Sequence, residues 1–263
     1  MRDRYHCQTA TREVFSRVFV FVRLKTLFRF IVFPLVLLAH GCVTGHWSTE
    51  SPSILRFEGY IEKSTAEDFF KIVTPDTRQI IVTSGGGDAA IGMTIAEYIF
   101  SHKIDIVVDG HCASSCANYL FLAANKKTVR PGSWLGFHGG TVIPSADIDK
   151  KLSQFNLTDE QKVEATRQLF LLAKKQDDFF RLVPGGDIVA RSYVIATDPR
   201  VAATVKASGY SKFAWLPSKE ELEKAGVKHI DSFGFPNASE RVELSKKHKG
   251  LLLSTEEVEA LKK

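Results

Sequence analysis

The chain contains a serine placed where it could act as a nucleophile. Ser114 follows the short apolar run 104–108, which reads as a buried strand. It precedes residues 115–124, which are apolar nearly all round and predict a buried helix. A helix N-terminus presents free N–H groups and positive potential, and both stabilise the oxyanion of acyl transfer. Serine is also a common helix cap. This segment alone therefore fits a nucleophile and a capping residue equally well.

A histidine could supply the base that such a serine needs. His138 follows a predicted strand over 133–137 and precedes Gly139 and Gly140, which leave room for a substrate. Imidazole titrates near neutrality and is the usual acceptor of a serine hydroxyl proton. A single histidine in a glycine-rich loop can also have no catalytic part, so His138 is informative only together with Ser114.

A third segment could bind an anion. Gly85, Gly86 and Gly87 lie between a predicted strand over 79–83 and a predicted helix over 88–101. Glycines tolerate positive φ angles and let backbone N–H groups approach a ligand closely. The segment lacks the Lys-Ser/Thr of a phosphate loop and the spacing of a dinucleotide fold. It reads either as an anion-binding turn or as a tight turn with no further role.

Two cysteines flank the candidate nucleophile. Cys112 and Cys116 lack the second ligand pair that a zinc site needs, so we expect no metal. In an oxidising compartment the two could form a disulfide, and otherwise they are two small buried residues. Nothing in the sequence calls for an organic cofactor.

Together these segments resemble the proteolytic subunit of Clp protease and its relatives in the Clp/crotonase superfamily. The resemblance covers residues 80–140. The family's Gly-Gly turn and Gly-Met-Ser-Ile helix correspond to Gly86-Gly87 and Gly92-Met93-Thr94-Ile95 here. Its nucleophile segment, Gly-x-Ala-Ala-Ser-Met-Gly-Ala, corresponds to residues 110–117. Its histidine follows an Arg-x-x-x-Pro-x-Ser stretch and a strand, which correspond to Arg130, Ser133 and His138, 24 residues after Ser114.

The resemblance implies a serine peptidase with assigned roles. Ser114 would be the nucleophile, His138 the base, and the N–H groups of Gly87 and Ser115 the oxyanion hole. The family's catalytic aspartate would fall near Phe213 or Ala214, where this chain has no acid. Asp187 and Asp198 are possible third members, although each can also be an ordinary loop residue. A Ser-His dyad, or a triad completed by a carbonyl or water, is the alternative.

The elements that position these residues follow a βαβ rhythm. Strands alternating with helices predict an α/β fold with a mostly parallel sheet flanked by helices, and the resemblance implies repeated ββα units. Functional groups of such sheets collect at the carboxyl ends of the strands. Further predicted elements are a strand over 54–59, helices over 65–73, 157–182 and 219–225, and a strand over 227–231.

The N-terminal region predicts export. Seven basic and two acidic side chains in residues 1–29 precede the apolar run 30–39, which fits a signal-peptide core. Small residues before Cys42 leave three outcomes open, namely cleavage with lipidation at Cys42, ordinary cleavage, and retention as an anchor. We expect a signal or anchor over 1–42, a linker over 43–53, a hydrolase domain over 54–235 and a charged tail with a short helix over 236–263. The location would be periplasmic, or membrane-anchored and facing the periplasm.

The charge balance limits the partners. The net charge of +5 is all carried by residues 1–29, so the remainder is neutral and nucleic-acid binding is not expected. The predicted substrate is a peptide or protein, and the resemblance implies a homo-oligomer. Acyl-coenzyme A chemistry on the same fold is disfavoured by export, because coenzyme A is an intracellular cofactor. A catalytically degenerate protein that binds peptides or a partner is the remaining alternative.

Overall fold

The computed structural model describes residues 44–139, 148, 152–153 and 155–262. Residues Gly45–Lys263 form one compact unit, and Met1–Thr44 are assigned to another. The predicted signal or anchor segment and the lipidation candidate Cys42 lie outside the described residues.

Among the helices in those ranges, none is both long enough and apolar enough to cross a bilayer.

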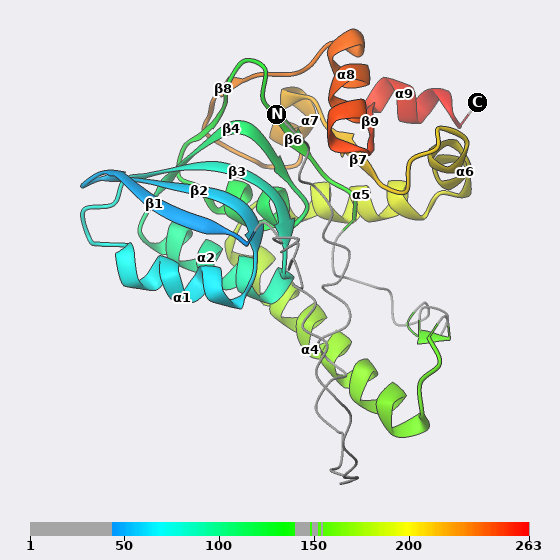
Figure 1. Ribbon diagram of the computed structural model, residues 1–263, viewed down its shortest axis with the longest axis horizontal. Helices are drawn as coiled ribbons and strands as arrows, with labels where there is room; N and C mark the ends of the chain where they lie inside the picture. The colour runs from blue at the N-terminus through cyan, green and yellow to red at the C-terminus, as the bar shows by residue number, and fades with distance from the viewer. Residues whose placement is uncertain (1–43, 140–147, 149–151, 154, 263) are drawn as a thin grey trace, which may run out of the picture. The chain divides into compact units, whose positions relative to one another are not determined.

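A seven-stranded, mostly parallel sheet forms the centre of the compact unit (Figure 1). Its order is β1-β2-β3-β4-β5-β8, with β6 also paired to β4, and within it only the β1–β2 pair is antiparallel. A separate parallel pair joins β7 to β9. The strands are β1 His46–Ser51, β2 Ile54–Ile61, β3 Gln79–Gly87, β4 Asp105–Ala113, β5 Lys127–Val129, β6 Trp134–Gly136, β7 Phe213–Leu216, β8 Ile230–Phe233 and β9 Leu251–Ser254.

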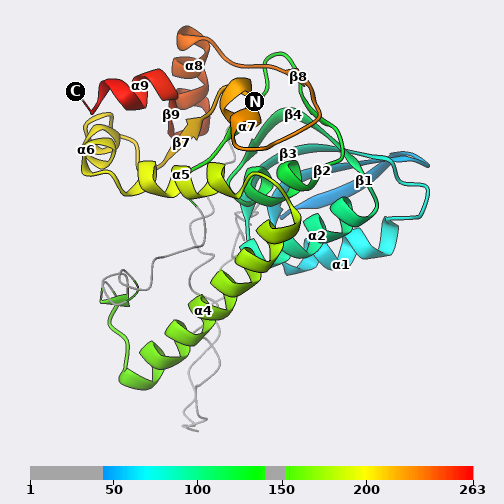
Figure 2. The ribbon, with the colours of Figure 1, turned by 180° about the vertical axis from the view of Figure 1, so that it is seen from behind.

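Helices flank this sheet, as Figures 1 and 2 show from opposite sides. Helix α2 contacts α1, η2 and α4, so these four elements pack side by side. The helices are α1 Lys63–Ile72, α2 Ala89–Ser101, η2 Cys116–Phe121, α4 Asp159–Leu182, α5 Gly186–Thr197, α6 Pro199–Ala207, α7 Lys219–Lys224, α8 Ala238–His248 and α9 Thr255–Ala260. The prediction of an α/β fold with a mostly parallel sheet flanked by helices is confirmed.

Strand β4 has two partners in succession, and this arrangement matters for the site. Its first half pairs with β5 through Ile106–Val108, and its second half pairs with β6 through residues 111–113. The sequence predicts a strand only over 104–108, because the following residues contain Gly110 and no apolar run. The longer strand brings β6 beside the segment that leads to Ser114.

Residues 43–53 are not a free linker. His46–Ser51 form β1, which pairs with β2. Trp47 explains this difference, because its side chain is 6% exposed and its indole Nε1 donates to the Thr65 carbonyl at 2.9 Å. One buried aromatic residue outweighs the polar composition of its neighbours.

Two C-terminal regions contain more structure than the sequence suggests. The sequence predicts no helix between residues 182 and 213, yet α5 and α6 lie there. In the predicted tail, the short helix is present as α9, opened by a capping box of Ser254 and Glu257. The tail also contains α8 and β9, and Leu252 and Leu253 of β9 are buried.

Candidate active site

Ser114 occupies the tight turn between β4 and η2. Its φ angle is +56°, a left-handed conformation that non-glycine residues seldom adopt and that is concentrated at functional sites. The Ser114 N–H donates to the Gly136 carbonyl at 3.1 Å, and the Ser114 carbonyl accepts from the Asn118 N–H at 2.7 Å. The predicted nucleophile is therefore held by β6 on one side and by the following helix on the other.

The glycine turn packs directly against this serine. Gly86 has φ +90°, and a Cβ there would lie 2.6 Å from both the Ala113 carbonyl oxygen and the Ser114 Cβ. Gly87 has φ +149° and approaches the backbone of Ile61 as closely. The Ser115 hydroxyl donates to the Gly87 carbonyl at 2.7 Å, so the two residues predicted to form the oxyanion hole are tied together.

A disulfide spans the nucleophile turn. Cys112 and Cys116 are joined, with Cα atoms 5.3 Å apart, and both are completely buried. Of the two alternatives that the sequence leaves open, the structure has the bridge. It encloses Ser114 and Ser115 in a short covalent loop at the end of β4.

His138 lies two residues beyond β6, whose last residue, Gly136, bonds the Ser114 N–H. Phe137 and Trp215 exchange two backbone hydrogen bonds of 2.8 and 2.6 Å in an antiparallel bridge. In that register Ala214 lies opposite His138. This is the place where the family resemblance expects an aspartate, and β7 supplies only a methyl group there.

His138 is exposed, yet its pKa departs from the ordinary value of histidine. The pKa of His138 is lowered from its ordinary value, chiefly by desolvation and further by the positive charge of Lys212. A neutral imidazole is the form that can accept a proton. Within the described residues, no carboxylate is hydrogen-bonded or ion-paired to this ring.

His111 is a second histidine near Ser114 in sequence, but its surroundings are different. Its ring stacks on Trp134 at 5.4 Å and lies 4.8 Å from the ring of His248. Burial, with the charges of His248 and Lys247, lowers the pKa of His111 to about 4. It packs with Trp134 and His248, and no hydrogen bond to Ser114 is found for it in the described part of the chain.

The two aspartates that the sequence offers as third members are not bonded to His138. Asp198 caps α6 and forms an ion pair with Arg200 at 2.7 Å, which lowers the pKa of Asp198 to about 2. Asp187 is exposed in the first turn of α5. Over the ranges that the structure covers, neither carboxylate reaches the imidazole.

Two buried polar residues that the sequence analysis does not single out lie at this site. Asn118 Nδ2 donates to the Gly139 carbonyl at 3.2 Å, and Ser192 Oγ accepts from the Gly139 N–H at 3.1 Å. Asn118 gives one sequence signal, since it is the polar residue within an otherwise apolar run. Ser192 gives none, because it follows Gly139 by 53 residues and lies in a helix that the pattern does not predict.

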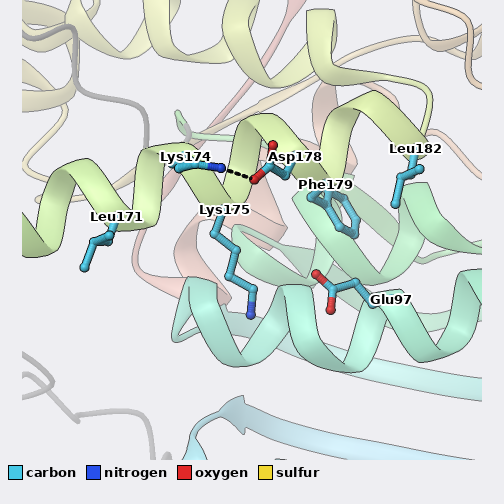
Figure 3. Close-up of a pocket in the computed structure, with 7 residues that line it drawn as sticks. All are labelled: Glu97, Leu171, Lys174, Lys175, Asp178, Phe179 and Leu182. Carbon is cyan, nitrogen blue, oxygen red and sulfur yellow. Dashed lines mark hydrogen bonds and ion pairs between the residues drawn. The ribbon is translucent and has the colours of Figure 1, made fainter.

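Two hollows are found in the described structure. One, of about 510 Å³, is bounded by α5, α6 and the start of β7, and its residue Ala196 contacts Gly139; it is lined by Ala196, Val201, Ala202, Val205, Lys206, Gly209, Tyr210, Ser211 and Phe213. The other, of about 340 Å³, lies between α2 and α4; Figure 3 shows its residues Glu97, Leu171, Lys174, Lys175, Asp178, Phe179 and Leu182. Only the first shares elements with the candidate site.

Comparison with known proteins gives distant similarity to solved structures and no match in sequence. No protein-family model matches the sequence, and no curated protein matches it. The fold is similar to a solved structure of a mutant of ClpP1 from Listeria monocytogenes, with 16% identity and a TM-score of 0.36, over 72% of this chain and 94% of that one. A likeness at this level establishes neither a family nor an activity for this chain.

Proposed function

We propose that this protein is an exported serine hydrolase that cleaves peptide bonds, with Ser114 as nucleophile and His138 as base. The observation that carries the proposal is the left-handed backbone of Ser114, packed against Gly86 and hydrogen-bonded to the strand that ends two residues before His138. Backbone strain is expensive and is retained mainly where it serves a function. A serine that only capped a helix would not need it.

The proposed reaction proceeds in two steps. The Ser114 Oγ attacks the peptide carbonyl carbon, and His138 accepts the hydroxyl proton. The oxyanion is held by the N–H groups of Gly87 and Ser115. When the tetrahedral intermediate collapses, the C–N bond breaks and His138 passes its proton to the leaving amine. A water then attacks the acyl ester, again with His138 as base, and releases the carboxylic acid and free Ser114.

Two features support the compartment and the self-association that we propose. The disulfide fits an oxidising compartment, since cytosolic thiols are usually kept reduced. Exposed apolar side chains on α4, such as Val163 at 70% and Phe170 at 66%, fit a surface that a second copy covers. Export to the periplasm, attachment to the membrane through the N-terminal segment and self-association are all parts of this proposal.

Labelling of the purified full chain with a fluorophosphonate tests the nucleophile. We expect the wild type to be labelled, Ser114→Ala to abolish labelling, and His138→Ala to reduce it to a small but measurable rate. Ser115→Ala should be labelled more slowly, because it loses the hydrogen bond to Gly87. Cleavage of reduced casein by the same preparations, followed by mass spectrometry, tests the peptidase activity.

A second function is favoured by the absence of an acid beside His138 in the described structure. A catalytically degenerate protein that binds peptides at this site, without cleaving them, needs neither a third catalytic residue nor an activated serine. Wild type that is folded, remains unlabelled and still binds peptides would establish that alternative.

A further inference from the structure

The loop that carries His138 is held through the backbone of Gly139, which is hydrogen-bonded to two side chains. Its neighbour Gly139 has φ +106°, and both of its peptide groups are bonded to buried side chains. The carbonyl accepts from Asn118 and the N–H donates to Ser192, from two different helices. Together these two bonds fix the direction in which the chain leaves His138.

Both side chains are almost fully enclosed. Asn118 is 3% exposed and Ser192 is 0% exposed. The Ser192 hydroxyl also donates to the Val189 carbonyl at 2.8 Å, which fixes its orientation so that its lone pair faces Gly139. Helix α5 packs against the same glycine, since a Cβ on Gly139 would lie 3.5 Å from the Ala196 Cβ. The contact is therefore rigid on the α5 side.

A contribution to stability does not explain why an asparagine occupies position 118. Its Oδ1 is buried and has no hydrogen-bond partner in the part of the chain that the structure describes. An unpaired buried acceptor is destabilising, and an apolar residue among the buried neighbours of η2 would avoid it. Asn118 also lies in a π-helix. This conformation is rare in proteins, and where it occurs it is often at a functional site.

The position of Asn118 connects the two halves of the site. Its backbone N–H donates to the Ser114 carbonyl, while its side chain donates to the Gly139 carbonyl. One residue thus contacts the turn of the predicted nucleophile and the loop of the predicted base. A change in its side chain would alter the placement of His138 relative to Ser114.

We infer that Asn118 and Ser192 are positioning residues that orient His138 through Gly139, in place of the carboxylate that this chain lacks beside the imidazole. The inference rests on the proposed function. In the usual triad an acid orients the base by bonding its ring. Here the backbone that follows the base is held, and the ring itself has no acid partner among the described residues.

The test compares Asn118→Leu and Ser192→Ala with wild type by two measurements. The first is the rate of fluorophosphonate labelling, which we expect to fall by roughly ten- to a hundredfold, as misplaced catalytic groups do. The same substitutions in a His138→Ala background should cause no further loss, because their effect is exerted through His138. The second is NMR of the His138 ring, whose chemical shift and titration should change in both variants.

Asn125→Ala is the matched control. Asn125 is a partly buried asparagine whose Nδ2 donates to Asp105 at 2.8 Å, and it has no contact with the site. We expect Asn125→Ala to lower the melting temperature, and to leave both labelling and the His138 signal at wild-type values. Should Asn118→Leu fail to fold, Ser192→Ala still tests the second hydrogen bond of Gly139, the one made by its N–H.

The outcomes separate this inference from the proposed function. Unchanged His138 signals in Asn118→Leu and Ser192→Ala would overturn the inference, whether or not Ser114 reacts. Equal losses of labelling with and without His138 would also overturn it, since the effect would then be general. Absence of labelling in folded wild type would overturn the proposed function, and with it the catalytic part of the inference.

Discussion

The two halves of the candidate site are built in different ways. The nucleophile half is formed by a continuous segment, in which β4, a disulfide and η2 follow one another within residues 105–121. The base half depends on contacts between distant residues, since Gly139 is held by Asn118 and Ser192, 21 and 53 residues away. The serine turn is thus closed by a local disulfide, although it also contacts Gly86 and Gly136, while the histidine loop depends on how η2 and α5 pack.

The largest effect is expected from a substitution that disrupts the nucleophile half. Gly86→Ala would place a Cβ 2.6 Å from the Ser114 Cβ, so we expect loss of labelling and destabilisation by about 3 kcal/mol or more. Gly132→Ala is the control, because Gly132 has φ +76° but a Cβ added to it would have no atom within 4 Å. It should cost only about 1–2 kcal/mol of backbone strain and keep its labelling. Urea denaturation gives both values, and equal costs would refute the close-packing explanation.

Removing the disulfide should have the next largest effect. For so short a loop, the double variant Cys112→Ala with Cys116→Ala should lose about 2 kcal/mol of the free energy of unfolding. The labelling rate should fall as well, because the bridge encloses the strained Ser114. The measurement is urea denaturation of wild type with and without reductant, beside the double variant. Full labelling in the unbridged protein would show that β4 and η2 suffice to hold the turn.

Filling the hollow beside the base half should affect substrates more than folding. Ala202 is exposed and lines the 510 Å³ hollow next to β7, so Ala202→Trp would occupy it. We expect kcat/KM for peptide cleavage to fall by roughly tenfold, as for a blocked side-chain pocket. Ala203→Trp, on the same helix but outside the lining of the hollow, should cleave like wild type. If both variants cleave equally well, the hollow takes no part in substrate binding.

The smallest expected effect is on pH dependence. Lys212 lowers the pKa of His138, so Lys212→Met should raise that pKa. The base must be neutral to act, and activity is therefore lost as pH falls through the pKa of His138. In wild type we expect this loss below the ordinary histidine pKa of about 6.5, and in Lys212→Met at a higher pH than in wild type. Labelling rates across the acidic and neutral range measure both curves, and coincident curves would contradict the role of Lys212.

The comparison also explains how far the sequence could be interpreted. Ser114, the glycine turn and the helix that follows Ser114 are each recognisable from the residue types within a few positions, although the contacts between them are not. His138 is recognisable as a residue type at the end of a strand, but its partners are not. Asn118 appears in sequence only as a polar residue in an apolar run, and Ser192 as an ordinary serine.

What the sequence alone determined is the alternation of strands and helices, the positive-φ glycines and a serine at a strand-to-helix junction, because hydrophobic period and turn chemistry are local properties. Only the tertiary structure decided that β1 joins the sheet through Trp47, that Ala214 lies opposite His138, and that α5 and η2 meet at Gly139. These contacts join residues distant in the chain, and their energy comes from burial that exists only once the core has formed.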